Sequence, residues 1–312
     1  MAESISNDDT DRPAEGSGQD QRAHFRIGRN AIPARPLEPA LYLVSTPIGN
    51  LGDITLRALE VLAASDILAC EDTRVSRVLL QRYGIERRPV AYHEHNAEAS
   101  GAALLEALAA GRSVALISDA GTPLVSDPGF RLVGSAIEAG HAVIPIPGAS
   151  APLAALAASG LPTDAFFFAG FLPAKQKARR ERIEAVGTIP GTIIFFESPH
   201  RLAATLADCA AVLGGGRGAV VCRELTKAFE DVRRGSLDAL AAFYADAASV
   251  KGEIVLLIAP YEPPSASADE AEALLKDLSA TMAPGQAATE AARITGLPRK
   301  TLYNRLLAMK KD

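Results

Sequence analysis

Short apolar runs alternate with longer segments of helical periodicity from Leu41 onward. The runs of strand length lie at 41–44, 67–70, 89–92, 114–117 and 142–145, and the helical segments between them lie at 55–64, 76–83, 98–110 and 129–139. A strand that is apolar throughout is buried on both faces, which is typical of parallel sheets. The alternation therefore predicts an α/β domain whose largely parallel sheet is covered by helices on both faces.

A second block of the same kind follows an alanine-rich helix that ends near residue 159. Its expected strands lie at 165–169, 191–196, 218–222 and 252–259, and its expected helices at 174–186, 200–213 and 237–247. A Pro/Ser-rich linker begins at Pro260. The predicted parts are a disordered tail over 1–39, α/β domains over 40–160 and 161–260 that meet near Gly160, and a helical appendage over 267–312.

The tail is rich in Ser, Asp, Gly, Gln and Pro, so it cannot bury enough apolar surface to offset the entropy of ordering. Over the whole chain, 48% hydrophobic and 22% charged residues are typical of a soluble enzyme with a sizeable core. No run approaches the roughly 18 apolar residues of a membrane span, and no signal pattern opens the chain. We therefore expect a cytoplasmic protein with no membrane partner.

Three loops of unusual composition follow strands of the first domain, at 46–53, 118–123 and 145–150. Ligands of open parallel sheets usually bind beyond the carboxyl ends of the strands. Glycine lets the backbone approach a ligand closely, and proline holds the shape of a loop. Each loop alone could be a tight turn, but the three together favour a ligand cleft. The first loop lacks the GxGxxG pattern of dinucleotide-binding folds, and no P-loop occurs.

No metal site is expected. The three cysteines are widely spaced without a CxxC pair, which favours free buried thiols, and no HExxH motif occurs. His93 and His95 lie two positions apart, as metal ligands on a strand can, but no third ligand is evident. A hydrogen-bonded loop or an RNA contact is the favoured interpretation of His93.

Charged residues directly follow expected strands at 70–74, 92–96, 196–201 and 222–227, and precede the last strand at 251–253. Each cluster alone could be a structural ion pair or a helix cap, and Asp72 and Ser198 are good capping candidates. Clusters that face one cleft would instead indicate a functional site.

Several long motifs resemble the ribosomal RNA small subunit methyltransferase I family. They are residues 45–54 (STPIGNLGDI), 71–74 (EDTR), 118–129 (SDAGTPLVSDPG), 147–150 (PGAS) and 196–201 (FESPHR). The resemblance runs from about Leu41 to Pro260 and into the appendage. It implies the tetrapyrrole methylase (class III methyltransferase) fold, in which two α/β domains bind S-adenosylmethionine between them. The first loop departs from the GxGxGD-like loop of that fold, as is typical of its RNA-modifying branch.

By this resemblance, the activity is 2′-O-methylation of a cytidine in the decoding region of 16S rRNA within the small ribosomal subunit, by a homodimer. The implied cofactor contacts are Pro47, Gly49, Asp119, Ala120, Thr122, Ser150 and Ala151. A ribose hydroxyl is a weak nucleophile, and a general base typically contributes roughly 10²–10⁴-fold. The candidates are Glu71, Asp72 and, provided that its pKa is lowered, Lys227. They are not ranked, since the acidic pair could instead orient Arg74.

Basic side chains are expected to contact RNA phosphates, with strong salt dependence. Around the cleft the candidates are Arg74, Arg201 and Arg223, with His93 as a further RNA contact. A basic segment over 175–182 adds Lys175, Arg179 and Arg180, and only Glu181 opposes its charge. A solvated helix face is the alternative for this segment.

The appendage has the pattern of a helix over 286–294, a turn at 295–297 and a basic helix over 298–310. Gly296 in the turn is typical of a helix-turn-helix. Arg299, Lys300 and Arg305 are its candidate RNA contacts, and a generic helical hairpin is the alternative.

Two rival functions remain open. The same fold could methylate a tetrapyrrole of the corrin or sirohaem pathway, although a porphyrinoid needs neither the basic segment nor the appendage. A non-catalytic nucleic-acid-binding regulator would need no crowded polar cleft and would bind no cofactor. The net charge of −5 does not exclude RNA, since phosphates respond to local basic patches.

Overall fold

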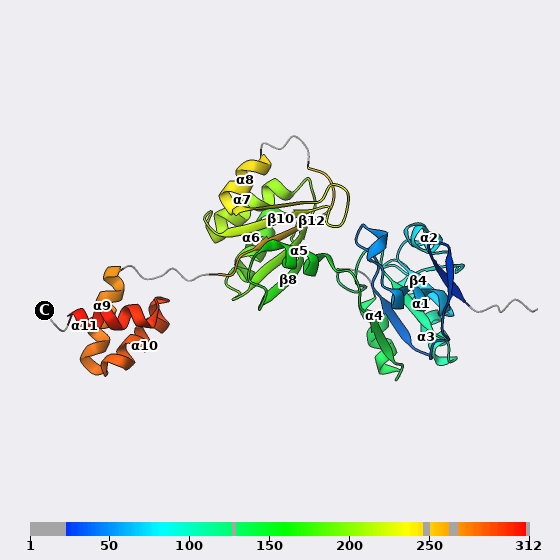
Figure 1. The fold of residues 1–312 in the computed structure, drawn as a ribbon, viewed down its shortest axis with the longest axis horizontal. Helices are drawn as coiled ribbons and strands as arrows, with labels where there is room; N and C mark the ends of the chain where they lie inside the picture. Colours follow the sequence, from blue (N-terminus) through cyan, green and yellow to red (C-terminus); the bar gives the residue numbers. More distant parts are fainter. Residues whose placement is uncertain (1–22, 127–128, 246–249, 262–267, 310–312) are drawn as a thin grey trace, which may run out of the picture. The chain divides into compact units, whose positions relative to one another are not determined.

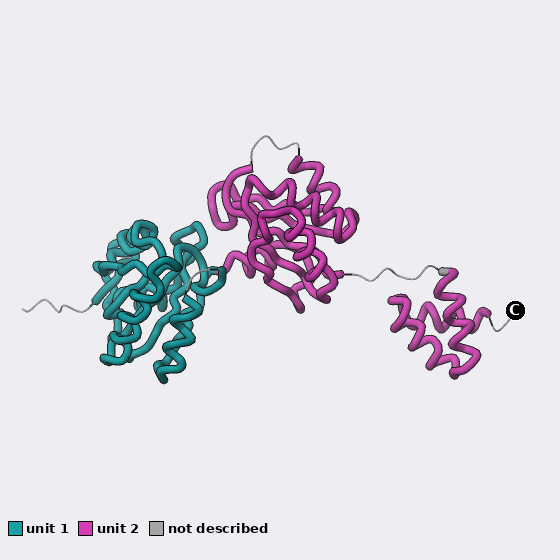
Figure 2. Tube along the Cα trace, turned by 180° about the vertical axis from the view of Figure 1, so that it is seen from behind, with its two compact units in different colours: residues 1–149 teal, residues 150–312 magenta. Residues whose placement is uncertain are grey.

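The computed structural model describes residues 23–126, 129–245, 250–261 and 268–309. Residues 23–149 hold a two-stranded hairpin and a five-stranded sheet, residues 150–261 hold a second five-stranded sheet, and residues 268–309 form a group of helices (Figure 1). The chain divides into two compact units, Met1–Ala149 and Ser150–Asp312 (Figure 2). Among the described residues, no helix has the length and apolar character needed to span a bilayer.

The sheet of the first unit has the order β5-β4-β6-β3-β7, and every neighbouring pair is parallel. Its strands are β3 (Leu41–Val44), β4 (Ile67–Cys70), β5 (Val90–Ala91), β6 (Val114–Ile117) and β7 (Val143–Ile146). The connecting helices are α1 (Leu56–Ala64), α2 (Thr73–Arg82), α3 (Ala97–Ala109) and α4 (Phe130–Glu138). The predicted parallel sheet is confirmed.

Successive residues of β3 enter different hydrophobic clusters, which shows that both faces of this sheet are covered. Tyr42 and Val44 pack in one cluster with residues of α1 and α2, whereas Leu41 packs in another with residues of α3 and α4. Alternate side chains of a strand point to opposite faces. The central strands β3, β4 and β6 are apolar throughout because neither of their faces meets water.

The expected disordered tail is wrong for residues 23–39. Strands β1 (His24–Ile27) and β2 (Asn30–Pro33) form an antiparallel hairpin, and Phe25 is buried in the same cluster as α1. The backbone N–H of Arg26 also donates to the carbonyl of Tyr83 at 2.7 Å. A few well-placed apolar side chains thus order a segment whose composition alone predicts disorder. The rest of the predicted tail, residues 1–22, lies outside the described residues.

The sheet of the second unit has the order β11-β10-β12-β9-β8. Its strands are β8 (Phe166–Phe171), β9 (Thr192–Glu197), β10 (Gly218–Arg223), β11 (Asp231–Ser236) and β12 (Ile254–Ile258). Only the β8–β9 pair is parallel, and the three other pairs are antiparallel. Strands β8, β9 and β10 therefore run in one direction and end at one edge of the sheet, where β12 begins. Strand β11 has no apolar run, which is why it was not predicted.

The helices of this unit are α5 (Ala151–Ser159), α6 (Gln176–Val186), α7 (Leu202–Leu213) and α8 (Leu237–Ala245). Helix α5 packs against β9, β10, β11 and β12, and Arg234 of β11 donates to the carbonyl of Ser159 at 2.8 Å. The two units consequently divide after Ala149, ahead of the expected boundary at Gly160. Gly160 instead ends α5 in the left-handed conformation, with φ of 78°.

Helices α9 (Ala268–Thr281), α10 (Pro284–Thr295) and α11 (Arg299–Met309) enclose a small core of their own, which includes Leu275, Leu302 and Leu306. Gly296 ends α10 with φ of 70°, so the predicted turn between α10 and α11 is confirmed.

Candidate functional site

Hydrogen bonds join the loops that follow β3, β6 and β7. Thr46 and Gly121 form an isolated backbone bridge, with N–H to carbonyl distances of 2.8 and 3.0 Å. The hydroxyls of Ser45 and Thr122 lie 3.1 Å apart, and Thr122 Oγ1 donates to the carbonyl of Ala149 at 3.4 Å. The three loops predicted as ligand-binding thus form one connected structure at the carboxyl edge of the first sheet.

Unusual backbone geometry marks the same loops. Leu124 and Ser126 have φ of 75° and 66°, in the left-handed region that costs non-glycine residues free energy. A Cβ on Gly148 would lie 2.8 Å from Cβ of Ser45, so only glycine allows this approach of the β7 loop to the β3 loop. Such strain clusters at ligand-binding and active sites.

Carboxylates from two neighbouring strands meet at this edge. Asp119, after β6, accepts the backbone N–H of Asp72, after β4, at 3.0 Å. Asp72 caps α2 through the N–H of Arg74 at 2.8 Å and also pairs with its guanidinium. Hydrogen bonds to the side chain and backbone of Arg74 lower the pKa of Asp72 to about 2. The predicted cap at Asp72 is confirmed, and this carboxylate is a weak proton acceptor.

Glu71 differs from its neighbour Asp72. Burial raises the pKa of the half-buried Glu71, the charges of Asp119 and Asp72 raise it further, and His93 opposes them. The backbone N–H of His93 donates to Asn96 Oδ1 at 2.8 Å, and its Nδ1 is buried with no hydrogen-bond partner among the described residues. Glu71 therefore combines burial with a pKa shifted towards neutrality, as a general base requires.

Lys227, the third candidate base, lies between two carboxylates in the second unit. Its Nζ lies 2.8 Å from Glu224 Oε1 and 3.1 Å from Glu253 Oε2. Burial alone would lower the pKa of Lys227, but the hydrogen bonds to Glu224 and Glu253 outweigh it and raise the pKa. The condition under which Lys227 could act as a base, a lowered pKa, is therefore not met, because its neighbours are anionic rather than cationic.

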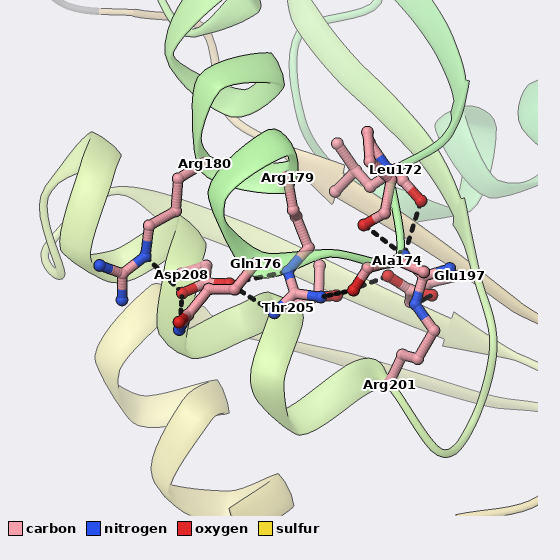
Figure 3. Close-up of polar contacts among 10 residues, drawn as sticks. Leu172, Ala174, Gln176, Arg179, Arg180, Glu197, Arg201, Thr205 and Asp208 are labelled. Atoms are coloured by element: carbon pink, nitrogen blue, oxygen red, sulfur yellow. Dashed lines mark hydrogen bonds and ion pairs between the residues drawn. The ribbon is translucent and has the colours of Figure 1, made fainter.

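Two of the predicted RNA contacts are instead committed to the interior of the second unit (Figure 3). Arg201 donates to the carbonyl of Leu172 at 2.6 Å and pairs with the buried Glu197 at 3.3 Å. Arg179 pairs with the buried Asp208 at 2.6 Å and exposes only 6% of its side chain. Both guanidiniums bind buried acceptors. A cluster of basic residues in the sequence does not show whether its side chains bind such internal acceptors or form a phosphate-binding surface.

The network around Glu197 also explains Ser198. Glu197 accepts the backbone N–H of Ser198 at 2.7 Å and the hydroxyl of Thr205 at 2.5 Å. Helix α7 is preceded by Arg201 at its cap position, so Ser198 is not the N-cap that the sequence favoured.

The other predicted basic residues are accessible to different degrees. Lys175 is exposed, and Arg180 leaves 48% of its side chain exposed while it pairs with Asp208. Arg223 is half-buried and donates to the carbonyl of Lys251 at 3.5 Å. In the helix-turn-helix, Arg299 and Lys300 are exposed at the start of α11, and Arg305 pairs with Glu272 at 2.9 Å.

The predicted cofactor residues fall in two groups. Pro47, Gly49, Asp119, Ala120 and Thr122 lie on the connected loops of the first unit, whereas Ser150 and Ala151 open α5 of the second. Ser45 and Thr46, which are not among the predicted residues, hold these loops together through their hydrogen bonds to Thr122, Ser118 and Gly121. Both stand in the first motif, where a hydroxyl residue beside a glycine loop could have indicated them. No group of three His, Cys, Asp or Glu side chains within the described ranges is placed to hold a metal ion.

The chain matches the family model of tetrapyrrole (corrin/porphyrin) methylases over residues 40–241 and that of the RsmI C-terminal HTH domain over residues 265–310. A ribosomal RNA small subunit methyltransferase I from Mesorhizobium japonicum is 62% identical over 284 residues, which cover 91% of this chain and 97% of the relative. Its counterpart from Escherichia coli O157:H7 is 47% identical over 266 residues, or 84% of this chain and 93% of the relative.

Solved structures with low identity share the fold. A diphthine synthase has a TM-score of 0.56 at 19% identity, with 70% of this chain and 89% of that chain covered. A cobalt precorrin-4 methyltransferase has a TM-score of 0.53 at 16% identity, with 71% of this chain and 95% of that chain covered. The predicted two-domain tetrapyrrole methylase fold is confirmed.

Proposed function

The chain belongs to the ribosomal RNA small subunit methyltransferase I family and is an S-adenosylmethionine-dependent rRNA methyltransferase, and we propose that its acceptor is the ribose 2′-oxygen of a cytidine in the decoding region of 16S rRNA. The observation that supports an oxygen acceptor is Glu71, a half-buried carboxylate with a raised pKa at the ligand-binding edge of the first sheet. A hydroxyl nucleophile has a proton to lose, and in this proposal Glu71 accepts it.

The chemistry of the first unit's edge fits the cofactor. S-adenosylmethionine brings a methyl group on a positively charged sulfonium, together with an α-ammonium. The edge carries the carboxylates of Glu71, Asp72 and Asp119, which favour a cationic ligand electrostatically. We assign cofactor binding to both groups of loop residues: Pro47, Gly49, Asp119, Ala120, Thr122, Ser150 and Ala151.

Among the three candidate bases, the contacts favour Glu71. Asp72 is held by Arg74 and its pKa is lowered to about 2, so it takes a proton poorly. Lys227 is protonated and paired with two carboxylates, so it has no lone pair to offer. In this assignment Glu71 takes up the proton of the 2′-hydroxyl, and Asp72 holds Arg74 at the edge of the site. S-adenosylmethionine would supply the methyl group, and its methyl–sulfur bond would break to leave neutral S-adenosylhomocysteine.

RNA binding is assigned to the accessible cations. These are Arg74, whose side chain is 86% exposed, with Lys175, Arg180 and Arg223 in the second unit and Arg299, Lys300 and Arg305 in the helix-turn-helix. His93 adds a contact near Glu71. Arg179 and Arg201 are withdrawn from this set, because their guanidiniums bind buried acceptors.

The family also supports three finer proposals: a homodimer, a cytoplasmic location and the assembled small ribosomal subunit as the form of the substrate. The helix-turn-helix offers a second contact region that free nucleosides would not need. A large, folded RNA substrate would use it.

The test is to incubate the protein with tritiated S-adenosylmethionine and undermethylated small ribosomal subunits, and to map the label by nuclease digestion and mass spectrometry. Label on a decoding-region cytidine 2′-oxygen is expected. Label on a base carbon or nitrogen would overturn the oxygen acceptor. Absence of label on subunits, together with label on a tetrapyrrole supplied in parallel, would overturn the RNA substrate.

A further inference from the structure

Phe229 is an exposed aromatic residue on the loop between β10 and β11, with 74% of its surface exposed. The same loop buries its other large apolar residue, Leu225, which is 9% exposed. The loop therefore separates its two apolar side chains, one into the core and one to the surface. The location is also specific, because β10 ends at the sheet edge where β8 and β9 end and β12 begins.

Backbone geometry and hydrogen bonds hold this loop in one shape. Glu224 and Thr226 have φ of 51° and 65°, which non-glycine residues rarely adopt. The N–H of Glu224 donates to the carbonyl of Glu253 at 2.9 Å, and the N–H of Thr226 donates to Glu230 Oε2 at 2.6 Å. The N–H of Glu230 donates to the carbonyl of Lys227 at 3.2 Å. Because the loop is ordered on both sides of Phe229, the ring is presented at a defined place.

Charged and small residues surround Phe229 along the chain. Ala228 and Glu230 flank it, and the ammonium of Lys227 is fixed between Glu224 and Glu253. A single ring in charged surroundings is too small an apolar area for a stable protein interface, which needs a contiguous patch. It does match the area of one nucleobase, and unpaired bases in RNA are commonly recognised by stacking on aromatic side chains.

We propose that Phe229, held outward by the strained loop between β10 and β11, stacks on an unpaired base of the ribosomal RNA substrate and so positions the acceptor strand. The proposal rests on the proposed function, since it takes RNA as the substrate. Phe229 makes no bond to the reacting atoms in this assignment and acts through the placement of the RNA. Loss of the ring should therefore weaken RNA binding and leave cofactor binding intact.

Kinetics with undermethylated small subunits test the role of the ring. Phe229→Ala is expected to raise KM for subunits about tenfold or more, the scale of one base–aromatic stack. Phe229→Leu, which keeps apolar bulk without the ring, should behave like Phe229→Ala, whereas Phe229→Trp should keep the original KM. The affinity for S-adenosylmethionine should be the same in all three variants.

A matched control comes from Phe166, which is 47% exposed at the start of β8. Phe166 therefore lies at the end of the strands opposite to the loop that carries Phe229. Phe166→Ala should leave KM for subunits unchanged. If Phe229→Leu retains the original KM, the ring serves only as apolar bulk and the proposal is overturned. If Phe229→Ala and Phe166→Ala raise KM equally, the effect is general destabilisation and the proposal is likewise overturned.

The absence of tryptophan from the sequence allows a direct optical test. Phe229→Trp introduces a single tryptophan, which can be excited apart from the six tyrosines. Its emission should be quenched on binding a cytidine-rich single-stranded oligoribonucleotide, while Phe166→Trp should not respond. Emission from Phe229→Trp that shifts with protein concentration in the absence of RNA would instead assign the ring to self-association. Failure of the proposed function would differ from both results, since the unchanged protein would then not methylate subunits at all.

Discussion

The two sheet edges carry similar sequence patterns and use them differently. After β4 of the first unit, Glu71 is half-buried with a raised pKa, and Arg74 is exposed. After β9 of the second unit, Glu197 and Arg201 are tied to each other and to Thr205 and the carbonyl of Leu172. A strand followed by charged residues can thus precede either a candidate catalytic site or a set of internal ion pairs. Only the groups that surround each charged side chain decide between the two.

The largest expected effect comes from removing the proposed base at the candidate catalytic site. Glu71→Gln should lower kcat by about 10²–10⁴-fold, because the amide cannot take the acceptor proton. The affinity for S-adenosylmethionine, measured by calorimetry, should change little. Lys227→Met is the matched test in the second unit, and a larger loss of kcat there than in Glu71→Gln would reverse the assignment.

The pH profile of the unchanged protein sharpens the same assignment. Glu71 must be deprotonated to act, so kcat should fall as pH is lowered through the pKa of Glu71. Burial raises this pKa above its ordinary value of 4.5, so the acidic limb should lie above that pH. The limb should vanish in Glu71→Gln, and a limb that persists there would belong to another group.

The next effect concerns the interior of the second unit, where Arg179 was predicted to bind RNA. Arg179→Met removes the buried cation that pairs with Asp208 and leaves only Arg180 and Gln176 as its partners, which should destabilise folding by about 1.5–3 kcal/mol. Urea unfolding would measure this change. Lys177→Met on the same helix, where the side chain is 92% exposed, should alter stability by less than about 1 kcal/mol.

Acid titration of stability provides an independent check on Asp208. Burial by itself would raise the pKa of Asp208, but hydrogen bonds from Arg180, Arg179 and Gln176 outweigh it and lower the pKa below 3.8. Since the folded pKa is depressed, the stabilisation is present above the ordinary aspartate pKa and is lost as pH falls through the folded pKa. Asp208→Asn should therefore be less stable at neutral pH and lose less stability on acidification.

The exposed cations of the helix-turn-helix should give a smaller effect, and one that depends on salt. Arg299→Gln combined with Lys300→Gln should weaken binding to small subunits and reduce the slope of log affinity against log salt by about 1 for each lost phosphate contact. Filter binding over a range of salt would measure the slope. An unchanged slope would assign these side chains to the solvated face of α11.

The smallest effect is expected at the surface pair of α10. Arg293 lies 2.6 Å from Glu290, and its side chain is 71% exposed. Arg293→Ala should leave the stability of the helix-turn-helix nearly unchanged, because water screens exposed pairs. A loss comparable to that of Arg179→Met would show that short ion-pair distance, rather than burial, governs these networks.

The sequence by itself determined the elements of the first unit from Leu41 onward, its parallel sheet and the loops predicted to bind a ligand. Fully apolar strands and helical periodicity are local signals, and the motifs at 45–54 and 118–129 stand where those strands end. The turn at Gly296 was also readable, because few residues other than glycine adopt the left-handed conformation that ends a helix there.

Only the tertiary structure decided which charges are available to a substrate. Arg179 and Arg180 are neighbours in the same basic segment, yet one exposes 6% of its side chain and the other 48%. The order of the hairpin at 24–33 and the position of β11 likewise depend on partners distant in the sequence, Tyr83 for the hairpin and Ser159 for β11. Burial and hydrogen bonding depend on such long-range contacts. The same residue type therefore serves as a candidate base, as an internal ion-pair partner or as part of a binding surface, according to the groups that the fold places beside it.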